Sequence, residues 1–395
     1  MIQSLIVSGA DCATLLSQRI AGLSLFERIR RSAARAGIPQ VHLICPEPHS
    51  GHPALPHGIV LEDPERLVAD PAERHILLEC GYFPDVDLLV WLDSIRPEDL
   101  PAYLEERPHI LVVRGDQVRE AAGRLIQGAT LSDLALQLGA ASGLRHMPME
   151  RGRLLDASSP TAIRKAEKAL FRSLIKDTEG FMSKHVERPI SLAISKRLVE
   201  TSLTPNQMSL ISIFVGLIGA LLMSWPDRFW PICGALLFLF HSILDGCDGE
   251  LARIKFMESR LGGVIDFWGD NVVHAAVFIG IARHWSATKP GLWPQVMAVL
   301  ATAGGLASAA LVYWQTMRSK NAVEPQFTSV VKDHQASSLS RVADALSRRD
   351  FIYLVVILAI MGKLEWFLMA SAVGAPAFFA ALVWIHTRES KAPNL

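Results

Sequence analysis

The sequence DGCDGELARIKFMESRLGGVIDFWGD, residues 245–270, is acidic in the middle of an apolar region. It contains four aspartates, Asp245, Asp248, Asp266 and Asp270. A carboxylate at the centre of a bilayer costs about 2.5–3.5 kcal/mol on insertion scales, so the four must face a wet cavity, pair with cations or bind metal. On helices, spacings of three and four residues put the members of each pair on one face. A turn near residues 258–262 would bring the two faces together.

Four convergent carboxylates need about two divalent cations to offset their mutual repulsion. Oxygen-only ligands suit Mg²⁺, Mn²⁺ or Ca²⁺ better than zinc. Such a site can grip a diphosphate and stabilise phosphoryl transfer. The alternatives are a cation-conducting cluster and a packing cluster.

Long apolar runs flank these acids. Uncharged runs cover residues 208–225, 229–244 and 292–314, and interrupted ones cover 263–285 and 351–386. The last run is long enough for two passes and breaks near Gly362. About 20 apolar residues span a bilayer as a helix, so we expect six spans, although any single run could be a buried core helix.

Composition sets limits on the function. Half of the 395 residues are hydrophobic, 20% are charged, and 39 basic residues balance 39 acidic ones. A predominantly disordered chain is therefore excluded, and a nucleic-acid partner is not expected. Because the part up to about residue 205 resembles a soluble protein, we expect three regions: a cytoplasmic domain over 1–155, a linker with a juxtamembrane helix over 156–205, and a membrane domain over 206–390.

Lys and Arg concentrate in the segments before the first span, between the second and third, between the fourth and fifth, and after the sixth. This bias predicts a multi-pass protein of the inner or plasma membrane with both termini cytoplasmic. Residues 1–10 lack the pattern of a signal peptide. The five cysteines show no CxxC spacing, which argues against disulfides and a zinc site.

The first domain alternates short apolar runs with amphipathic stretches. Strands are expected at 2–7, 41–45, 75–79 and 109–113, with helices at 23–36 and 159–175. This rhythm is typical of an α/β domain with a mostly parallel, Rossmann-like sheet. Residues 183–200 mix basic and apolar residues. They predict either an amphipathic helix on the membrane surface or a connecting helix packed on the soluble domain.

The acidic stretch resembles the signature of the CDP-alcohol phosphotransferases, D-x2-D-G-x2-A-R-x8-G-x3-D-x3-D, at every defined position. The resemblance covers about residues 160–390 and implies an all-α domain of six transmembrane helices. It implies metal-dependent transfer of a substituted phosphate from a CDP-alcohol to an acceptor hydroxyl with release of CMP, in phospholipid or polyol-phosphodiester synthesis. It also implies a homodimer.

Site residues follow from the same resemblance. Asp245, Asp248 and Asp266 would hold two Mg²⁺ or Mn²⁺ ions, and Asp270 would act as general base with some metal contact. The CDP-binding positions would be Asp248, Gly249, Ala252, Arg253, Gly262 and Asn206.

An acceptor phosphate could be bound by Arg188, Lys196 and Arg197, which could equally be positive-inside anchors or contacts to anionic lipid. Arg349, with Lys332, Arg341 and Arg348, supplies further candidates. His241 and His274 lie in apolar surroundings and are interpreted as structural.

The first 150 residues weakly resemble sugar-nucleotide nucleotidyltransferases, through Gly22–Arg28 and an Ala36-Gly37-Ile38 turn. The loop after the first strand offers only Gly9, no Lys precedes Lys165, and Tyr82 stands where the family has a metal-binding Asp. We therefore predict that this domain transfers no nucleotide, although Glu79 or Asp11 could still hold a metal.

The two-part layout resembles bifunctional inositol-phosphate cytidylyltransferase and di-inositol-phosphate phosphate synthase proteins. One alternative is therefore a bifunctional enzyme whose first domain is an active CTP-dependent cytidylyltransferase. The other is an ion-coupled transporter that uses the buried carboxylates as its ion site.

Overall fold

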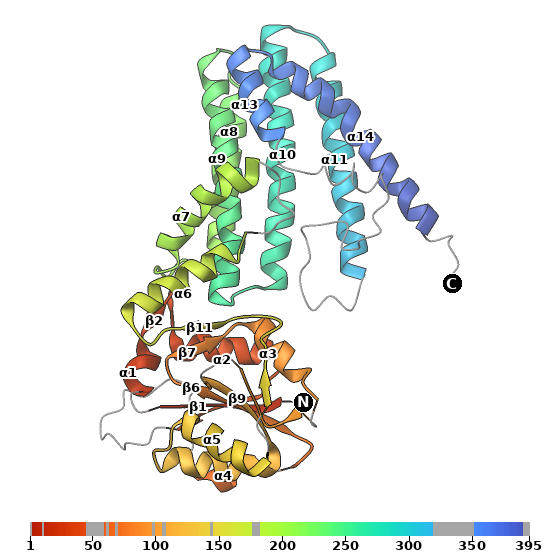
Figure 1. Cartoon of the computed structure of the whole chain (residues 1–395). Helices are drawn as coiled ribbons and strands as arrows, with labels where there is room; N and C mark the ends of the chain where they lie inside the picture. The colour runs from red at the N-terminus through yellow and green to blue at the C-terminus, as the bar shows by residue number, and fades with distance from the viewer. Residues whose placement is uncertain are drawn as a thin grey trace. The chain divides into compact units, whose positions relative to one another are not determined.

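The computed structural model forms two compact units, Met1–Arg172 and Ser173–Leu395. The first is built on a β-sheet and the second is helical (Figure 1). The structure describes residues 2–9, 12–44, 59–60, 63–67, 70–96, 99–104, 108–142, 145–175, 182–318 and 351–389.

Seven strands of the described chain form the main sheet, in the order β10-β8-β9-β6-β1-β4-β5. At its centre β1 (Ile2–Ser8) runs parallel to both β4 (Gln40–Ile44) and β6 (Arg74–Glu79). The other strands are β5 (Ile59–Val60), β8 (Ala102–Leu104), β9 (Ile110–Arg114) and β10 (Arg145–Met147). Only β9 among them runs antiparallel to its neighbours, so the predicted mostly parallel sheet is confirmed.

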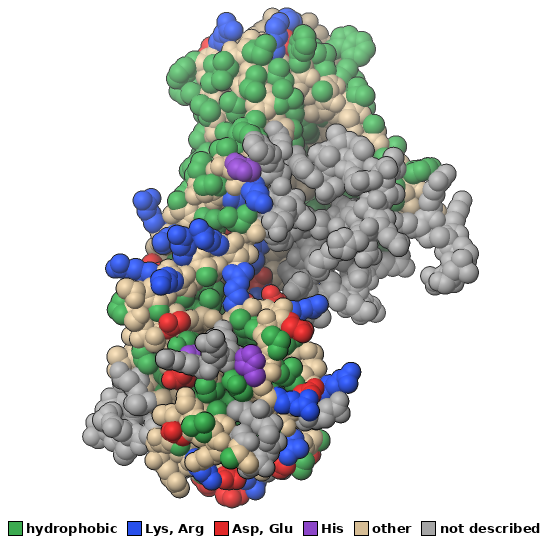
Figure 2. Space-filling model, viewed as in Figure 1, with side chains coloured by type: hydrophobic (Ala, Val, Ile, Leu, Met, Phe, Trp, Pro, Cys, Tyr) green, Lys and Arg blue, Asp and Glu red, His purple; other side chains and the backbone are tan. Residues whose placement is uncertain are grey.

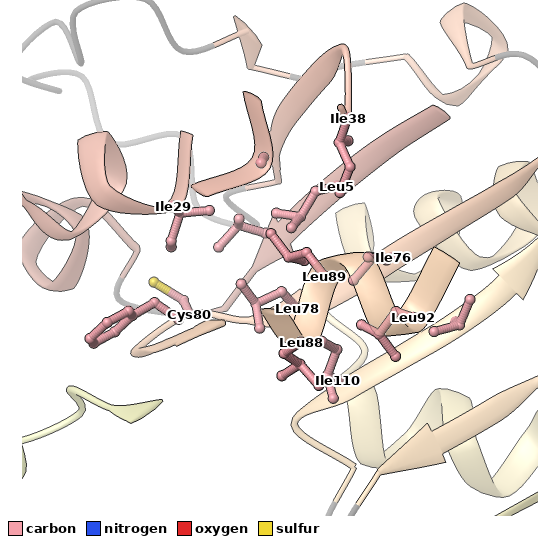
Figure 3. Close-up of a cluster of buried hydrophobic side chains, with 14 of the residues drawn as sticks. Leu5, Ile29, Ile38, Ile76, Leu78, Cys80, Leu88, Leu89, Leu92 and Ile110 are labelled. Carbon is pink, nitrogen blue, oxygen red and sulfur yellow. The ribbon is translucent and has the colours of Figure 1, made fainter. Parts of the chain in front are cut away.

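Successive residues of the central strands point to opposite faces, and each face is covered by helices. Leu5 and Ile76 enter one core with α1 (Cys12–Ser17), α2 (Leu25–Arg35) and α3 (Val86–Asp93), part of which Figure 3 shows. Ile6 and Leu77 enter the other with α4 (Gly115–Ile126) and α5 (Leu131–Ser142). The unit is therefore an α/β layer domain, as the sequence predicts.

Two short antiparallel pairs complete this unit: β2 (Arg19–Ile20) with β3 (Leu23–Ser24), and β7 (Tyr82–Pro84) with β11 (Leu154–Asp156). A short 3-10 helix covers Pro64–Arg66. Helix α6 (Pro160–Arg172) begins with its predicted proline, and Ala166 enters the first core. The Glu167 carboxylate accepts a hydrogen bond from the backbone N–H of Ala21 at 2.9 Å, which joins α6 to the β2–β3 hairpin.

The amphipathic pattern of residues 23–36 predicts that Arg28, Arg30, Arg31 and Arg35 lie on the solvent side of the helix. This is wrong for Arg28, which is only 2% exposed. Its Nη2 donates to the carbonyls of Ile20 and Ala21 at 2.8 and 3.1 Å, and so holds the hairpin against α2. Burial lowers the pKa of Arg28 to about 10, which still leaves the guanidinium charged at neutral pH.

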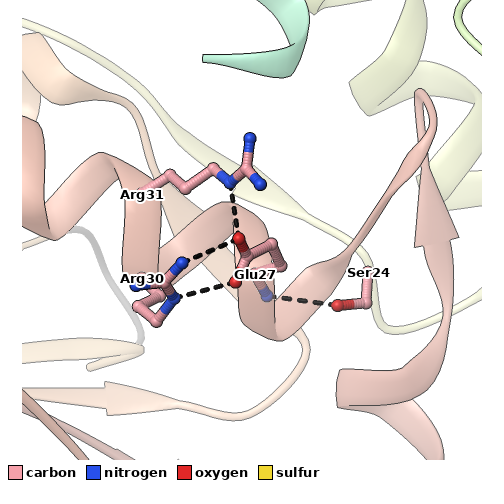
Figure 4. A network of polar contacts seen from close by, with 4 residues as sticks. All are labelled: Ser24, Glu27, Arg30 and Arg31. Carbon is pink, nitrogen blue, oxygen red and sulfur yellow. Dashed lines mark hydrogen bonds and ion pairs between the residues drawn. The ribbon is translucent and has the colours of Figure 1, made fainter. Parts of the chain in front are cut away.

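The neighbouring Glu27, by contrast, lies at the surface of α2, where Arg30 and Arg31 bind its carboxylate and Ser24 accepts its backbone N–H (Figure 4). The hydrogen bond from Arg30 is the main cause of the lowered pKa of Glu27.

Replacing Arg28 with Met should therefore lower the free energy of unfolding of the sheet unit by about 2–4 kcal/mol, because two buried carbonyls lose a charged donor. Thermal unfolding of the full chain, followed by circular dichroism, measures this loss. Arg30→Met on the same helix is the matched control, and its partly exposed ion pair should contribute less than about 1 kcal/mol. Equal effects of the two substitutions would contradict this interpretation.

The helical unit begins with one π-helical turn, Ser183–Glu187, which continues into α7 (Arg188–Leu198). The apolar helices are α8 (Pro205–Met223), α9 (Phe229–Lys255), α10 (Arg260–Thr288), α11 (Trp293–Arg318), α13 (Phe351–Met361) and α14 (Leu364–Glu389). Five of these helices are long and apolar enough to cross a membrane. Leu210, Phe214 and Leu221 of α8 are exposed, and Figure 2 shows hydrophobic side chains spread over the visible face of this unit. The chain is thus an integral membrane protein.

The fifth predicted span is only partly seen. Its described part, α13, has 11 residues, too few for a full crossing, and it starts where the described chain resumes. The break near Gly362 is confirmed, because Gly362 adopts a φ of +65° between α13 and α14.

Helix α8 packs against both α9 and α10 through small residues. A Cβ on Gly216 would lie 2.6 Å from Val273 of α10, and one on Gly219 would lie 2.9 Å from the Gly234 carbonyl of α9. Thr204 caps α8 in a reciprocal hydrogen-bond pair with Gln207. These contacts set α8 as the element that positions the other two helices.

Candidate functional site

Four acids predicted to converge come from α9 and α10, which are linked by a tight reversal. Phe256 is the C-cap residue of α9 and adopts the left-handed conformation with φ +54°. Ser259 caps the start of α10, and its hydroxyl accepts a hydrogen bond from the Gly262 N–H at 3.0 Å. The predicted turn thus lies at the boundary between the two acidic pairs.

Three of the carboxylates meet. Asp245, Asp248 and Asp266 each offer one oxygen, and these oxygens lie within 4.8 Å of one another. Asp245 and Asp248 are only 5% and 6% exposed, whereas Asp266 is half-buried. They form the one group of three or more acid, His or Cys side chains with metal-binding spacing in the part of the chain that the structure describes.

Asp270 stands apart from this trio. Its Oδ1 lies 3.5 Å from Nε2 of His241, and Nδ1 of His241 lies 2.9 Å from the Ser212 carbonyl. Because a carbonyl only accepts hydrogen bonds, Nδ1 carries a proton. His241 was interpreted as structural from its apolar surroundings, and its contact with Asp270 was missed. Its position four residues before Asp245, on the same helical face, was the available signal.

The donor set fits a hard divalent cation. Ligand oxygens lie about 2.0–2.1 Å from Mg²⁺, so oxygens around one ion are at most about 4 Å apart. The measured limit of 4.8 Å is therefore close enough for one oxygen from each aspartate to share an ion after small rotations. Three oxygens at one point also repel one another strongly when few waters surround them.

Helix α8 adds two polar contacts beside the acids. Ser209, itself 3% exposed, donates a short hydrogen bond to Oδ2 of Asp248. Asn206 lies against the first turn of α10, because a Cβ on Gly262 would meet its Oδ1 at 2.8 Å. A larger side chain at position 262 would therefore displace the Asn206 amide from its present place. Ser209 was not singled out in the sequence, although it follows Asn206 by three residues.

Gly249 and Arg253 lie together on α9. The guanidinium of Arg253 passes 3.8 Å from the place of a Cβ on Gly249, and the glycine has no closer neighbour among the described residues. Ala252 is half-buried on the same helix. Small side chains therefore leave space beside the acids, next to a cation.

The acceptor candidates separate in the structure. Nη1 of Arg188 binds Oε1 of Glu250 at 2.9 Å, whereas Lys196 and Arg197 are exposed on α7. Arg349, together with Lys332, Arg341 and Arg348, lies outside the described residues. Of the three described candidates, only Lys196 and Arg197 are therefore exposed.

The part of the sheet unit that carries Gly9, Glu79 and Tyr82, the positions compared above with nucleotidyltransferases, is closely packed. A Cβ on Gly9 would lie 2.8 Å from Cβ of Cys80, and Tyr82 stacks on His109 at 4.0 Å between ring centres. Glu79 binds Nδ1 of His109 at 2.5 Å, and Asp11 lies outside the described residues. The Glu79 carboxylate thus has a hydrogen-bond partner in His109, and a metal at Glu79 stays a prediction.

Comparison with known proteins gives a match over most of the helical region. Residues 202–385 match the family model described as CDP-alcohol phosphatidyltransferase. The acidic stretch 245–270 lies inside the matched residues.

Similar proteins include one named "Bifunctional IPC transferase and DIPP synthase" in Thermococcus kodakarensis, 36% identical over 42% of this chain and 36% of that protein. A protein of the same name in Rubrobacter xylanophilus is 29% identical over 67% of this chain and 71% of that protein. The match thus spans only about a third of the first of these relatives. The phosphatidylinositol phosphate synthase structure of Mycobacterium tuberculosis with CDP-DAG bound aligns with 50% of this chain and 94% of its own, at 20% identity and a TM-score of 0.33.

Binding of Mn²⁺ to the purified protein tests the three-acid group. Asp266→Asn should weaken binding by at least about tenfold, because one charged ligand oxygen becomes a neutral amide. Electron paramagnetic resonance of free Mn²⁺ measures this. Glu365→Gln on α14 makes the same acid-to-amide change and should leave binding unchanged. If Asp266→Asn bound Mn²⁺ as tightly as the parent protein, the assignment of Asp266 as a metal ligand would be wrong.

Proposed function

We propose that this chain is a metal-dependent CDP-alcohol phosphotransferase that transfers a substituted phosphate to an acceptor hydroxyl and releases CMP. The observation that carries the proposal is the meeting of Asp245, Asp248 and Asp266 within 4.8 Å inside the residues that match this family model. Two Mg²⁺ or Mn²⁺ ions are proposed, and when bound they supply positive charge to the diphosphate as CMP departs.

Asp270 is the proposed general base. Its carboxylate takes the proton of the acceptor hydroxyl, whose oxygen forms the new bond to phosphorus while the bond from phosphorus to the CMP oxygen breaks. The electron pair of that broken bond leaves with CMP. His241 lies beside Asp270, and its other nitrogen is fixed by Ser212. Asp270 can therefore hold one orientation, as proton transfer requires.

The donor nucleotide is proposed to lie along α9 beside Gly249 and Ala252, where side chains are smallest. Arg253 and Asn206 would contact its phosphates, since Arg253 lies beside Gly249, the residue after Asp248, and Asn206 lies beside Gly262. Gly262 keeps α10 close to Asn206. The acceptor is assigned to cations of α7, Lys196 and Arg197, and to Arg349.

Incubation of the purified full chain with Mg²⁺ and a panel of CDP-alcohols and acceptors tests the reaction. We expect CMP release that depends on the acceptor, with inositol phosphate in the panel because phosphatidylinositol phosphate synthases of Mycobacterium are among the relatives. Asp270→Asn should lower kcat by about 10²-fold or more, as expected for loss of a general base. Glu365→Gln should keep the activity.

Full activity in Asp270→Asn would defeat the assignment of the base. Absence of CMP from every CDP-alcohol, together with ion flux through reconstituted vesicles, would favour the transporter instead.

The sheet unit is proposed to have no nucleotidyltransferase activity. The supporting observations are the absence of Lys before Lys165, the contact of Gly9 with Cys80, and Tyr82 stacked on His109. The full chain with CTP, Mg²⁺ and a panel of polyol and sugar phosphates should release no pyrophosphate. Release of pyrophosphate would favour the bifunctional enzyme that the similar proteins are named for.

Homodimerisation and a cytoplasmic location of both termini belong to the same proposal, and they derive from the family resemblance and the distribution of Lys and Arg.

A further inference from the structure

Helices α7 and α9 contact each other through polar side chains, although apolar residues surround them. Glu250 of α9 is fully buried at 0% exposure. Its Oε1 accepts from Nη1 of Arg188 at 2.9 Å and from the hydroxyl of Ser191 at 2.7 Å. Two donors of α7, one turn apart, therefore bind one carboxylate oxygen of the helix that carries Asp245 and Asp248.

Close backbone packing adds to this contact. A Cβ on Gly246 would lie 3.4 Å from Nη1 of Arg188 and 3.7 Å from the Ser191 side chain, and Cys247 donates its thiol to the Ser191 carbonyl at 3.5 Å. Gly246 and Cys247 fill the interval between the two metal-binding aspartates of α9. Helix α7 thus rests directly behind the acidic segment.

The face that α7 turns inward is its polar one. Ser191 and Ser195 are each 1% exposed, whereas Ile190 is 42% exposed. Apolar side chains slide past one another at little cost, but a buried carboxylate fits only the register that offers its donors. The Glu250 contact therefore fixes how far α9 is rotated and how high it stands against α7.

Helical geometry shows where Asp245 and Asp248 lie around α9 relative to Glu250. Glu250 follows Asp248 by two residues and Asp245 by five, which places it about 200° and 140° around the helix from them at 100° per residue. The ion pair is on the far side of α9 from the acids. It cannot be a ligand, but it holds the face that carries the ligands.

We propose that Glu250 and Arg188 are positioning residues, whose buried ion pair orients α9 so that Asp245 and Asp248 meet Asp266. Arg188 then serves α9 rather than an acceptor phosphate. The inference rests on the proposed function only for the measurement of CMP release. Binding of Mn²⁺ reports the alignment of the three aspartates directly.

Without Arg188 the fully buried carboxylate of Glu250 keeps the Ser191 hydroxyl but loses this cation, and without Glu250 the guanidinium of Arg188 loses this carboxylate. We expect α7 and α9 to move in either variant, because a buried charge that loses its partner is strongly destabilising. Oε2 of Glu250 already has no hydrogen-bond partner among the described residues. Without Arg188, this carboxylate would turn toward Arg253, three residues further along α9, and draw that cation from the donor side.

The test compares Arg188→Met, Glu250→Met and the reversed pair Arg188→Glu/Glu250→Arg in the purified full chain. Binding of Mn²⁺ alone is followed by electron paramagnetic resonance, and kcat and KM for CMP release are measured in parallel. Lys289→Met is the matched control, since it removes the exposed partner of an ion pair of 3.6 Å between Lys289 and the mostly buried Glu365. Arg188→Gln and Glu250→Gln replace the Met variants if those fail to fold, as judged by circular dichroism.

Each single variant should weaken Mn²⁺ binding by about 10–100-fold, the usual effect of losing a group that supports metal ligands, and should lower kcat. The reversed pair should recover binding to within about threefold of the parent, and Lys289→Met should match the parent.

The inference is overturned if the single variants bind Mn²⁺ normally and Arg188→Met raises only the KM of a phosphorylated acceptor. It is also overturned if the reversed pair binds as weakly as the single variants. If the variants show the expected Mn²⁺ binding but the parent protein releases no CMP, the proposed function is refuted and the inference still holds.

Discussion

Repulsion among three carboxylates in a nearly waterless bundle is the constraint on which the helical unit depends. Like charges a few ångströms apart in low dielectric separate unless the helices that carry them are held firmly or a cation lies between them. Helix α8 packs on both α9 and α10 through glycines and gives Asp248 a hydrogen bond from Ser209. The packing of small residues is therefore part of the chemistry, because it keeps the acids within reach of one ion.

Much of this arrangement could be predicted from the sequence. The 26-residue acidic stretch predicts that its two acidic pairs meet and that a turn lies between them. Both features are local, because a single reversal of the chain separates the two pairs. The four predicted strands agree with β1, β4, β6 and β9 to within about two residues, since each is an apolar run that is buried in the sheet. The short strands, such as β2, β3 and β7, were not predicted, because two or three residues give no periodic pattern. The spacing of His241 from Asp245 indicates the helical face of His241, but the partners of His241, Ser209 and Glu250 could not be predicted. They depend on how helices are rotated against one another, and hydrophobic periodicity does not fix that rotation when both faces of a helix are buried.

The sheet unit separates the residues that stabilise its fold from those that a nucleotide site would need. Its stability comes from two layers of apolar side chains, such as Leu5 and Ile76 on one face and Ile6 and Leu77 on the other. Gly9 at the end of β1 packs against Cys80, which belongs to the first of these cores. A fold of this kind can form whether or not the residues at its strand ends bind a nucleotide, so the proposal that the unit transfers no nucleotide depends on those residues and not on the fold.

The length of α9 has a consequence for where the reaction takes place. Its 27 residues form one unbroken helix of about 40 Å, which exceeds the roughly 30 Å hydrocarbon layer of a bilayer. Asp245 and Asp248 follow Phe229 by about 24 and 28 Å of helix rise, nearly the thickness of that layer. Acids at this height of a spanning helix would lie near one surface of the membrane, where a water-soluble nucleotide and a lipid headgroup can both reach them. The ion site would then be accessible both from water and from the lipid phase, which suits a reaction between a water-soluble and a lipid-soluble substrate.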